Sequence, residues 1–535
     1  MREEQWAQAG QTAVYDVTVI GGGATGLGVA LDAALRGFSV LLLESHDFGG
    51  GTSSRSTKLL HGGVRYLAQG NISLVHEALA ERTTVMHIAP HLAQPLPFVM
   101  PSYQWWQTPF YGVGLKAYDL LAGKAGLGST EWLNRREVQE ALPGIRANAL
   151  HGGVKYWDGQ FDDARLALAL ARTTERAGGV VLNYADVQAI DDLPASAPTD
   201  ARFDITVTDK RLEQQHHFKT RCLINAAGVW VDQIRQMADR AANKTPHHRM
   251  ISPSQGVHVV VDRDFMPGNH ALLIPKTSDG RVLFAVPWMG SLILGTTDTP
   301  RTDMPREPDP FASELEFILS ESSKVLSRPV TRQDIRSVWV GLRPLVAAPP
   351  SQSGAATKTL SREHTIVTDP SGLVTVTGGK WTTYRVMAED TLSACFKAGL
   401  LPTRPGGATK SHTLVGAAQI GGQSHAIWQS PGPHLYGGEI DAVNQCPGAE
   451  KDLGFGLTEA MVRFAARHEY AQTVEDVLAR RWRVLFLDAR QARVMASAVA
   501  EILREETGLD PELDAFEQMT EHYLPQNSQV LAADS

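Results

Sequence analysis

The chain has 535 residues, of which 43% are apolar and 20% charged, and its formal net charge is −8. This length predicts about three domains with a large apolar core, and the negative charge argues against nucleic acid as a partner, because proteins that bind it carry a basic face. The three cysteines lie far apart and form no C-x-x-C pair, which indicates a reducing, cytoplasmic compartment. No apolar run reaches the roughly 18 residues that a membrane span needs, so we expect any membrane contact to be peripheral.

Residues 15–44 predict a strand, a glycine turn, a helix and a second strand that ends on an acidic residue. Three glycines of the turn have the spacing G-x-G-x-x-G, which places backbone N–H groups and a helix N-terminus against a diphosphate. The acid, Glu44, can accept hydrogen bonds from both hydroxyls of an unphosphorylated ribose, which favours FAD or NAD over NADP. A tight turn that binds no nucleotide is the alternative. The predicted cofactor contacts are Gly21, Gly22, Gly23, Thr25, Gly26 and Glu44.

A glycine- and hydroxyl-rich segment follows at 49–58 and continues through 59–67. Its side chains offer donors to a phosphate or to the edge of a flavin, and two adjacent glycines let the backbone lie flat against an isoalloxazine ring. Arg65 and Tyr66 are then expected to face outward from that passage. A flexible surface loop is the alternative. The predicted cofactor contacts in this segment are Thr52, Ser53, Ser54, Lys58, Leu59, His61, Gly62 and Gly63.

Residues 71–90 predict a helix with one apolar face. Beyond it, residues 103–118 contain six aromatic side chains, with Trp105 and Trp106 adjacent. Aromatic rings with polar tips are common where a protein meets a membrane interface. A packing patch between domains is an equally good interpretation, because Lys116 and Lys124 are the only cations between 103 and 125.

Two later strand ends also carry small or polar residues. A buried strand that begins at Cys222 ends in Ala226, Ala227 and Gly228, and we expect this small end to touch the cofactor. Residues 256–300 alternate as an antiparallel sheet does. His258 falls there on the face opposite its apolar neighbours, where a lone histidine is more often a core residue. The last of these strands is followed by Thr296 and Asp298.

The remaining chain predicts a second glycine junction and a helical end. Arg343 lies on a tight apolar turn, and a strand at 373–376 leads through two glycines and Lys380 into a helix, so that Gly379 and Thr382 are predicted cofactor contacts. The helix N-terminus there can stabilise negative charge on a reduced flavin. Residues 401–450 are rich in Gly, Pro and Ser, which predicts a linker or irregular region, and 451–535 have helical periodicity.

These motifs resemble the FAD-dependent glycerol-3-phosphate dehydrogenase family over nearly the whole chain. The most specific segments are Ile20–Gly37, Lys58–Leu67, Gly295–Asp298, Gly341–Leu345 and Gly378–Arg385. The resemblance implies an α/β plus α fold: a Rossmann-like FAD-binding domain interleaved with an antiparallel-sheet substrate domain, followed by a helical C-terminal domain. The expected oxidoreductase region is 1–400, with FAD-binding parts at about 14–90, 150–250 and 335–400 and substrate parts at about 91–149 and 251–334.

The resemblance also implies a reaction. The enzyme would oxidise sn-glycerol 3-phosphate to dihydroxyacetone phosphate, with hydride transfer from C2 to FAD and electrons passed to a membrane quinone. The planar guanidinium of arginine can donate two hydrogen bonds to a phosphate dianion. Arg65 and Arg343 are therefore the expected ligands of phosphate or substrate oxygens, with Tyr66 adding a hydroxyl. The enzyme would then sit peripherally on the inner face of the cell membrane.

Two residues are candidates for the base that takes the hydroxyl proton. A neutral imidazole near pH 7 suits proton removal, which favours His258. Lys380 is expected to hold the developing alkoxide, and the choice between Lys380 and His258 as base stays open. Thr296 and Asp298 are expected to shape the site around them.

Two other functions fit parts of the same pattern. An oxidase of this fold could use oxygen on glycerophosphate, a 2-hydroxy acid or an amino acid, because carboxylates also favour arginine. A non-catalytic flavin-binding protein could recruit a partner through its helical C-terminus. The chain has one dinucleotide motif rather than two, which argues against NAD(P)H as a partner. The chain could also form a homodimer.

Overall fold

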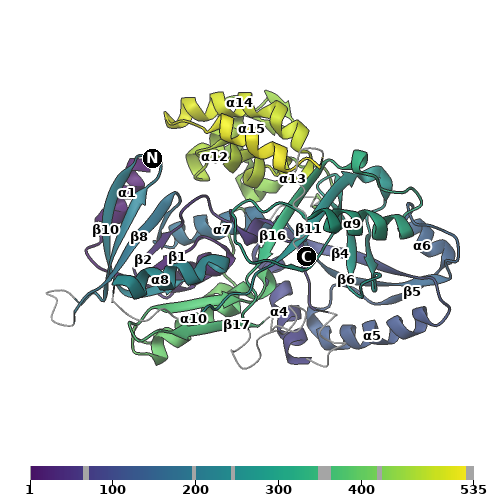
Figure 1. The fold of residues 1–535 in the computed structure, drawn as a ribbon, viewed down its shortest axis with the longest axis horizontal. Coiled ribbons are helices and arrows are strands. Elements are labelled where there is room, and N and C mark those ends of the chain that lie inside the picture. The colour runs from purple at the N-terminus through teal and green to yellow at the C-terminus, as the bar shows by residue number, and fades with distance from the viewer. Residues whose placement is uncertain are drawn as a thin grey trace.

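The computed structural model describes residues 2–63, 72–194, 200–241, 248–347, 363–417 and 425–525. Two sheets lie side by side, and a C-terminal group of helices lies over the region where they meet (Figure 1). Among these residues no helix is both long and apolar enough to cross a bilayer.

The first sheet has a parallel centre around β1 (Tyr15–Ile20), as the opening motif predicts. Within the described residues its strand order is β17-β18-β10-β1-β2-β7, and β8 and β9 extend it through β10. β10 returns beside β1 in parallel register and places Asn225 opposite Ile20, so its small C-terminal end meets the glycine turn. The other bounds are β2 (Val40–Leu43), β7 (Val180–Leu182), β8 (Ala185–Asp192), β9 (Phe203–Asp209), β10 (Gln214–Asn225), β17 (His364–Thr368) and β18 (Val374–Gly378).

Helices cover both faces of this sheet, and β2, whose four residues are all apolar and buried, shows the pattern expected of a strand covered on both sides. Val17 and Val19 of β1 pack toward α2, α7 and α10, whereas Tyr15 and Ile20 share a cluster with α1 and α8. The bounds are α1 (Arg2–Gly10), α2 (Ala24–Leu35), α7 (Asp163–Arg176), α8 (Val231–Ala241) and α10 (Tyr384–Lys397).

The second sheet is largely antiparallel and has the order β15-β11-β14-β13-β12-β4-β6-β3, with β16 paired to β11 and β5 to β6. The expected limits near 150 and 335 assign β6 and β16 to the FAD-binding parts, but hydrogen bonding places both strands in this sheet. The strand bounds are β3 (Leu59–Leu60), β4 (Ala93–Ser102), β5 (Glu131–Asn134), β6 (Gly152–Phe161), β11 (Ser254–Asp262), β12 (Ala271–Ile274), β13 (Leu283–Trp288), β14 (Ser291–Gly295), β15 (Thr299–Pro300) and β16 (Ser337–Arg343). Its helices are α4 (Ile72–Ile88), α5 (Gln107–Ala122), α6 (Arg135–Ala141) and α9 (Ala312–Val325).

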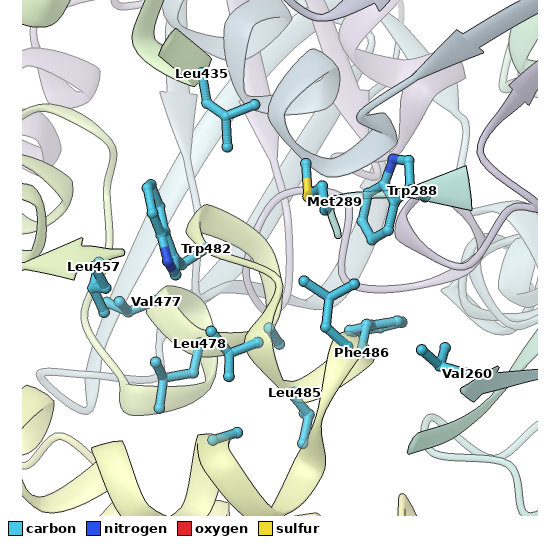
Figure 2. Packing of buried hydrophobic residues seen from close by; sticks show 14 of the residues in the cluster. Val260, Trp288, Met289, Leu435, Leu457, Val477, Leu478, Trp482, Leu485 and Phe486 are labelled. Carbon is cyan, nitrogen blue, oxygen red and sulfur yellow. The ribbon is translucent and has the colours of Figure 1, made fainter. Parts of the chain in front are cut away.

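The C-terminal helices share a hydrophobic core with the second sheet (Figure 2). Trp288 and Met289 at the β13–β14 turn lie in one cluster with Trp482 and Phe486 of the C-terminal region. Each fully buried large apolar side chain contributes roughly 1.5–3 kcal/mol to holding the parts together. The elements are α12 (Glu459–His468), a π-helical turn (Asp476–Arg481), α13 (Val484–Leu487), α14 (Ala489–Thr507), α15 (Leu513–His522) and the strands β19 (Asp452–Gly454) and β20 (Leu457–Thr458).

The segment 401–450, expected as a linker or irregular region, is irregular but packed. Its short helical elements are 3₁₀ turns at Ala408–Lys410 and Pro433–Glu439 and the helix α11 (Ile440–Asn444). Leu435 and Tyr436 are buried in the shared core, and Glu439 pairs with Arg172 of α7. This segment therefore fixes the C-terminal helices against the first sheet.

Candidate functional site

A cavity of about 750 Å³ lies where the two sheets meet. Its wall includes the glycine turn after β1, the end of β2 and the small end of β10 on one side, and residues of β11, β16 and the Gly379 junction on the other. The predicted site residues that line it are Gly21, Gly23, Thr25, Glu44, Thr52, Ser53, Leu59, His61, Ala226, Ala227, Gly228, His258, Arg343, Gly379, Lys380 and Thr382.

The glycine turn is shaped for close contact with a diphosphate. Gly21 has a φ of 112°, and a Cβ atom there would lie 2.5 Å from the carbonyl oxygen of Ala226. The first N–H of α2, at Ala24, donates to Ser53 Oγ at 2.9 Å, which puts that hydroxyl at the helix N-terminus with Gly23. Glycine backbone at a helix N-terminus in a large cavity, with a serine hydroxyl beside it, fits the diphosphate of a dinucleotide.

Gly26 is the glycine of this turn and helix that tolerates a side chain least. A Cβ atom on it would lie 1.9 Å from the Gly21 carbonyl oxygen. We expect Gly26→Ala to shift the turn at a cost of about 1–3 kcal/mol, which weakens dinucleotide binding about 10- to 100-fold. The flavin-to-protein absorbance ratio and a titration of apoprotein with FAD measure this. Gly114→Ala is the control, because a Cβ on Gly114 meets nothing within 4 Å; equal loss in both variants would contradict the prediction.

Glu44 lies where the ribose is predicted. Its carboxylate accepts hydrogen bonds from the N–H groups of Gly22 at 2.7 Å and His46 at 3.0 Å. A carboxylate has about four acceptor positions, so it can still accept from ribose hydroxyls. Burial raises the pKa of Glu44 above its ordinary value. Val187 and Met237 also line the cavity, and their apolar side chains suit contact with the aromatic base of a nucleotide.

The junction after β18 forms another part of the wall. Gly378 and Gly379 both have positive φ, and Lys380 precedes the short turn Trp381–Thr383 that opens into α10. Trp381 Nε1 donates to the Ser53 carbonyl oxygen at 2.7 Å, which ties this junction to the hydroxyl-rich loop. The predicted approach of a helix N-terminus to the cavity is therefore present in the structure.

His258 lies in the sheet between β14 and β16, paired with Gly295 and Trp339. Its ring stacks on Trp339 with centroids 4.0 Å apart, and Nε2 lies 2.9 Å from Thr57 Oγ1. Nδ1 has no hydrogen-bond partner among the described residues. Burial, Lys58 and Arg343 together lower the pKa of His258 well below its ordinary value, so the imidazole is neutral at pH 7. The position is both buried and part of the cavity wall.

Arg343 ends β16 and is held by the turn after β14. Its guanidinium donates to Asp298 Oδ1 at 3.2 Å and to the carbonyl oxygens of Gln255 and Thr297 at 3.1 and 2.9 Å. Thr296 Oγ1 lies at 3.4 Å. The predicted residues Thr296 and Asp298 are thus brought to Arg343 rather than to the cavity wall. Gly256 is required beside them, because a Cβ there would lie 2.3 Å from Arg343 Nη2.

Several predicted cofactor contacts lie behind the wall. Lys58, expected to face a phosphate, is completely buried, and its ammonium binds Asp163 at 2.7 Å and the Ser54 carbonyl oxygen at 2.7 Å. It lies 4.6 Å from the Trp339 ring centroid and so supports the site from beneath. The others that do not line the cavity are Gly22, Gly26, Ser54, Gly62 and Gly63. Arg65 and Tyr66 lie outside the described residues.

The wall residues that were not predicted include the polar or aromatic side chains Arg55, Thr57, Arg306 and Trp381. Thr57 and Arg55 belong to the hydroxyl-rich loop, so the loop's composition was the available signal. Trp381 follows the predicted junction directly. Arg306 lies in an irregular stretch between β15 and α9 that has no motif, and no local signal could have identified it.

Comparison with known proteins gives matches over almost the whole chain. Residues 16–385 match the family described as FAD dependent oxidoreductase, and 408–513 match the C-terminal domain of alpha-glycerophosphate oxidase. The mitochondrial glycerol-3-phosphate dehydrogenase of Bos taurus is 39% identical over 543 residues, covering 95% of this chain and 73% of that protein. The mitochondrial glycerol-3-phosphate dehydrogenase of Arabidopsis thaliana is 39% identical over 532 residues, covering 92% of this chain and 82% of that protein.

Solved structures give the same pattern. The glycerol-3-phosphate dehydrogenase of Bacillus halodurans, solved in complex with FAD, is 27% identical and has a TM-score of 0.75, covering 100% of this chain and 99% of that chain. The L-alpha-glycerophosphate oxidase of Mycoplasma pneumoniae, at 14% identity, has a TM-score of 0.57 over 75% of this chain and 98% of its own, so it shares the fold.

Proposed function

The chain belongs to the FAD-dependent glycerol-3-phosphate dehydrogenase family, and on this premise we propose that it oxidises sn-glycerol 3-phosphate to dihydroxyacetone phosphate and passes the electrons to a quinone. FAD is its cofactor, and when bound it accepts a hydride and delivers both electrons to the acceptor. The observation that supports the substrate best is that His258, Arg343 and Lys380 line the same dinucleotide-sized cavity.

The chain's own residues suit each part of this chemistry. Arg343 and Lys380 supply positive charge for a phosphate dianion or a developing alkoxide. His258 is neutral at pH 7 and can accept the hydroxyl proton. Gly21, Gly23 and the N-terminus of α2 hold the diphosphate, and Glu44 holds the ribose. Lys380 is the other candidate base, and the variants described in the Discussion separate the two.

Anaerobic addition of glycerol 3-phosphate to the purified protein tests the substrate. We expect the absorbance of oxidised flavin near 450 nm to bleach, whereas 2-hydroxyglutarate and glycine leave it unchanged. Bleaching by either of those acids, with none by glycerol 3-phosphate, would overturn the proposed substrate and favour an acid oxidase.

The electron acceptor has a second candidate. The C-terminal match carries the description of an alpha-glycerophosphate oxidase, which favours oxygen as an alternative to quinone. Reoxidation of the reduced protein by a soluble quinone analogue and by air-saturated buffer distinguishes them. We expect the quinone to be the faster oxidant; rapid reoxidation by oxygen with stoichiometric hydrogen peroxide would assign the oxidase activity instead.

We also propose that the protein attaches peripherally to the inner face of the cell membrane through the surface of α5. Trp105 is 77% exposed, Phe110 66% and Leu120 84%, and Trp106, Val113 and Trp132 are exposed nearby. Large exposed rings on one helix and its neighbours suit a lipid interface. The cation Lys116 lies on the same helix, 5.5 Å from the Trp132 ring.

The double variant Trp105→Ser/Phe110→Ser tests this surface. Each aromatic side chain that no longer enters the lipid interface makes the free energy of membrane binding less favourable by roughly 1.5–3 kcal/mol. We therefore expect binding to anionic liposomes, measured by co-sedimentation, to fall at least about 10-fold. Val494→Ser is the control, since Val494 is 75% exposed on α14. Unchanged liposome binding, with conversion of a dimer to a monomer in solution, would instead make this surface the interface of a homodimer.

A further inference from the structure

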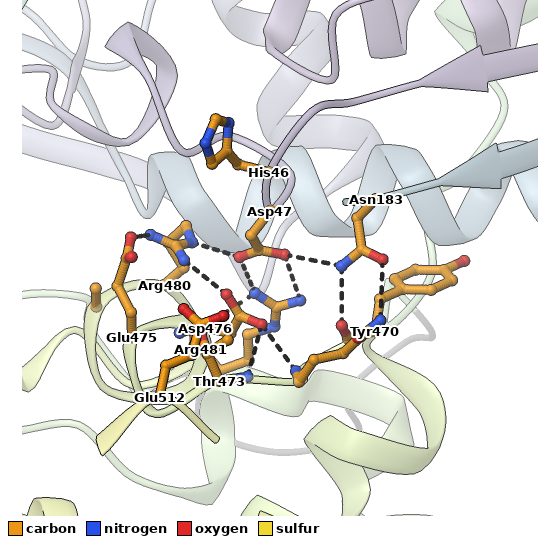
Figure 3. A network of polar contacts seen from close by, with 12 residues as sticks. His46, Asp47, Asn183, Tyr470, Thr473, Glu475, Asp476, Arg480, Arg481 and Glu512 are labelled. Carbon is orange, nitrogen blue, oxygen red and sulfur yellow. Dashed lines mark hydrogen bonds and ion pairs between the residues drawn. The ribbon is translucent and has the colours of Figure 1, made fainter. Parts of the chain in front are cut away.

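A buried ion network joins the C-terminal helices to the loop that carries Glu44 (Figure 3). Asp47, three residues after Glu44, is completely buried, and its carboxylate accepts hydrogen bonds from Arg480 and Arg481 of the π-helical turn. Arg481 binds both carboxylate oxygens, with Nη2 at 2.9 Å from Oδ1. A two-point arginine–carboxylate contact of this kind fixes direction as well as distance.

The loop that Asp47 belongs to is in turn bound to the glycine turn. Gly22 donates its N–H to Glu44 Oε2 at 2.7 Å, and Gly49 donates its N–H to the Gly22 carbonyl oxygen at 2.9 Å. Phe48 packs directly against Gly22, where a Cβ atom would lie 2.7 Å from the ring. Residues 44–49 and the glycine turn are therefore joined by hydrogen bonds and packing, and Asp47 is the residue of this unit that the C-terminal arginines bind.

The arginines themselves are positioned before they meet Asp47. Arg481 Nε donates to the Glu469 carbonyl oxygen at 3.1 Å, and Arg480 Nη2 donates to Asp476 Oδ1 at 2.8 Å. Asp476 also accepts from the hydroxyl of Tyr184 at 2.7 Å, on the first sheet's side of the contact. The network is thus held by hydrogen bonds at both ends, and Figure 3 shows the contacts of Asp47 and Asp476 with Arg480 and Arg481.

A second arm of the network reaches the cavity. Glu475 accepts a hydrogen bond from Arg480 and lies 3.8 Å from Arg306, which lines the cavity and approaches Gly50. Burial opposes ionisation of Glu475, but Arg480 and Arg306 outweigh it and lower the pKa of Glu475 to about 2. Glu475 is therefore charged at pH 7 and holds an arginine at the wall of the cavity.

Stability alone gives little reason for such a network, because a fully buried ion pair loses about as much solvation as it gains in attraction, and apolar side chains often replace one without loss. We propose that the C-terminal domain is part of the FAD site: Arg480 and Arg481 act through Asp47 as positioning residues that hold Glu44 and the glycine turn in place for the ribose and diphosphate. The inference depends on FAD as cofactor and not on the identity of the substrate.

The test is FAD binding by the full-length apoprotein, without substrate. We expect Arg481→Met to weaken FAD binding about 10-fold, a typical coupling between two sites. ADP, which has the ribose and diphosphate but no flavin, should compete more weakly by the same factor. In a double-mutant cycle, Arg481→Met and Glu44→Gln should be non-additive, because the first acts through the second. Arg463→Met is the control, since Arg463 pairs with Glu459, Glu505 and Glu506 inside the C-terminal domain.

Three results would overturn the inference: unchanged FAD affinity in Arg481→Met, weaker FAD binding with unchanged ADP binding, or an equal loss in Arg463→Met. If Arg481→Met does not fold, hydrogen exchange of the wild-type protein decides. Coupling between sites is reciprocal, so FAD should slow amide exchange in residues 473–481. Exchange there that is the same with and without FAD would also refute the inference. A failure of glycerol 3-phosphate to reduce the flavin would change neither result.

Discussion

Replacing His258 with asparagine should lower the rate constant of flavin reduction by glycerol 3-phosphate about 10²- to 10⁴-fold, the usual contribution of a positioned general base. Asparagine keeps a polar side chain in the sheet but cannot take a proton. The bound FAD should remain, because the groups proposed for its ribose and diphosphate lie on the first sheet and its loops. Anaerobic stopped-flow spectroscopy at 450 nm measures the rate, and the visible spectrum measures the FAD content.

Controls separate this effect from loss of packing. His91 is also a buried histidine, 6% exposed, and it is not among the cavity-lining residues, so His91→Asn should reduce the flavin at the wild-type rate. Lys380→Met distinguishes the two candidate bases. If Lys380 is a substrate ligand, its loss raises the substrate concentration needed for half-maximal rate. A larger fall in limiting rate for Lys380→Met than for His258→Asn would make Lys380 the base.

The pH dependence follows from the same environment. A base acts only when unprotonated, and an ordinary histidine, with a pKa of 6.5, would be half protonated at pH 6.5. Burial, with Lys58 and Arg343 nearby, lowers the pKa of His258 well below that value. The limiting rate of reduction should therefore stay constant as the pH falls from about 8 to about 6.5. A decline of the limiting rate centred on pH 6.5 would show that the pKa of the base is that of an ordinary histidine.

The second large effect is expected at Arg343. Arg343→Met removes the cation that Asp298 and the Gln255 and Thr297 carbonyl oxygens hold at the cavity. Hydrogen bonds to a charged group contribute about 1.5–3 kcal/mol each, so the substrate concentration for half-maximal reduction should rise about 10- to 100-fold for one lost contact. The half-maximal concentration of glycerol, which lacks the phosphate, should rise much less. The ratio between the half-maximal concentrations of glycerol and glycerol 3-phosphate should therefore become smaller.

The matched control for Arg343 is Arg336, which directly precedes the same strand and is not among the cavity-lining residues. Arg336 pairs with Asp262 at the surface and with Asp488 at the start of α14, and Arg336→Met should leave the binding of both substrates unchanged. Because Asp298 would lose its partner in Arg343→Met, the melting temperature should be measured as well. Equal weakening for glycerol and glycerol 3-phosphate would mean that Arg343 does not bind the phosphate.

Sequence patterns were most informative where backbone geometry is set locally. The strand, glycine turn, helix and acid of 15–44 were predicted and are present, since a tight turn at positive φ and a close helix approach demand glycine at fixed spacing. The antiparallel strands of 256–300 were predicted from their alternation. The glycine junction before α10 was found for the same reason as the first turn.

The errors came where a residue's partner lies far away in the sequence. Lys58 looks like a phosphate ligand beside its hydroxyl-rich loop, but Asp163, 105 residues away, binds its ammonium. His258 is not one of these errors: its strand pattern favours a core role and the family resemblance a catalytic one, and the residue is both buried and part of the cavity wall. Strands β6 and β16 join the second sheet through pairings that no local pattern specifies.

The amino-acid sequence by itself therefore determined the nucleotide-binding turn, several of the strands and helices, and the residue types available for catalysis, because these depend on dihedral preferences and on apolar periodicity within a few residues. Only the tertiary structure decided which charged groups face the cavity and which neutralise one another behind it. Asp47 and Arg481 are 434 residues apart in the chain and meet in a buried contact. Pairings of that kind are chosen by the packing of whole domains, which sets where a charge can find its partner away from water.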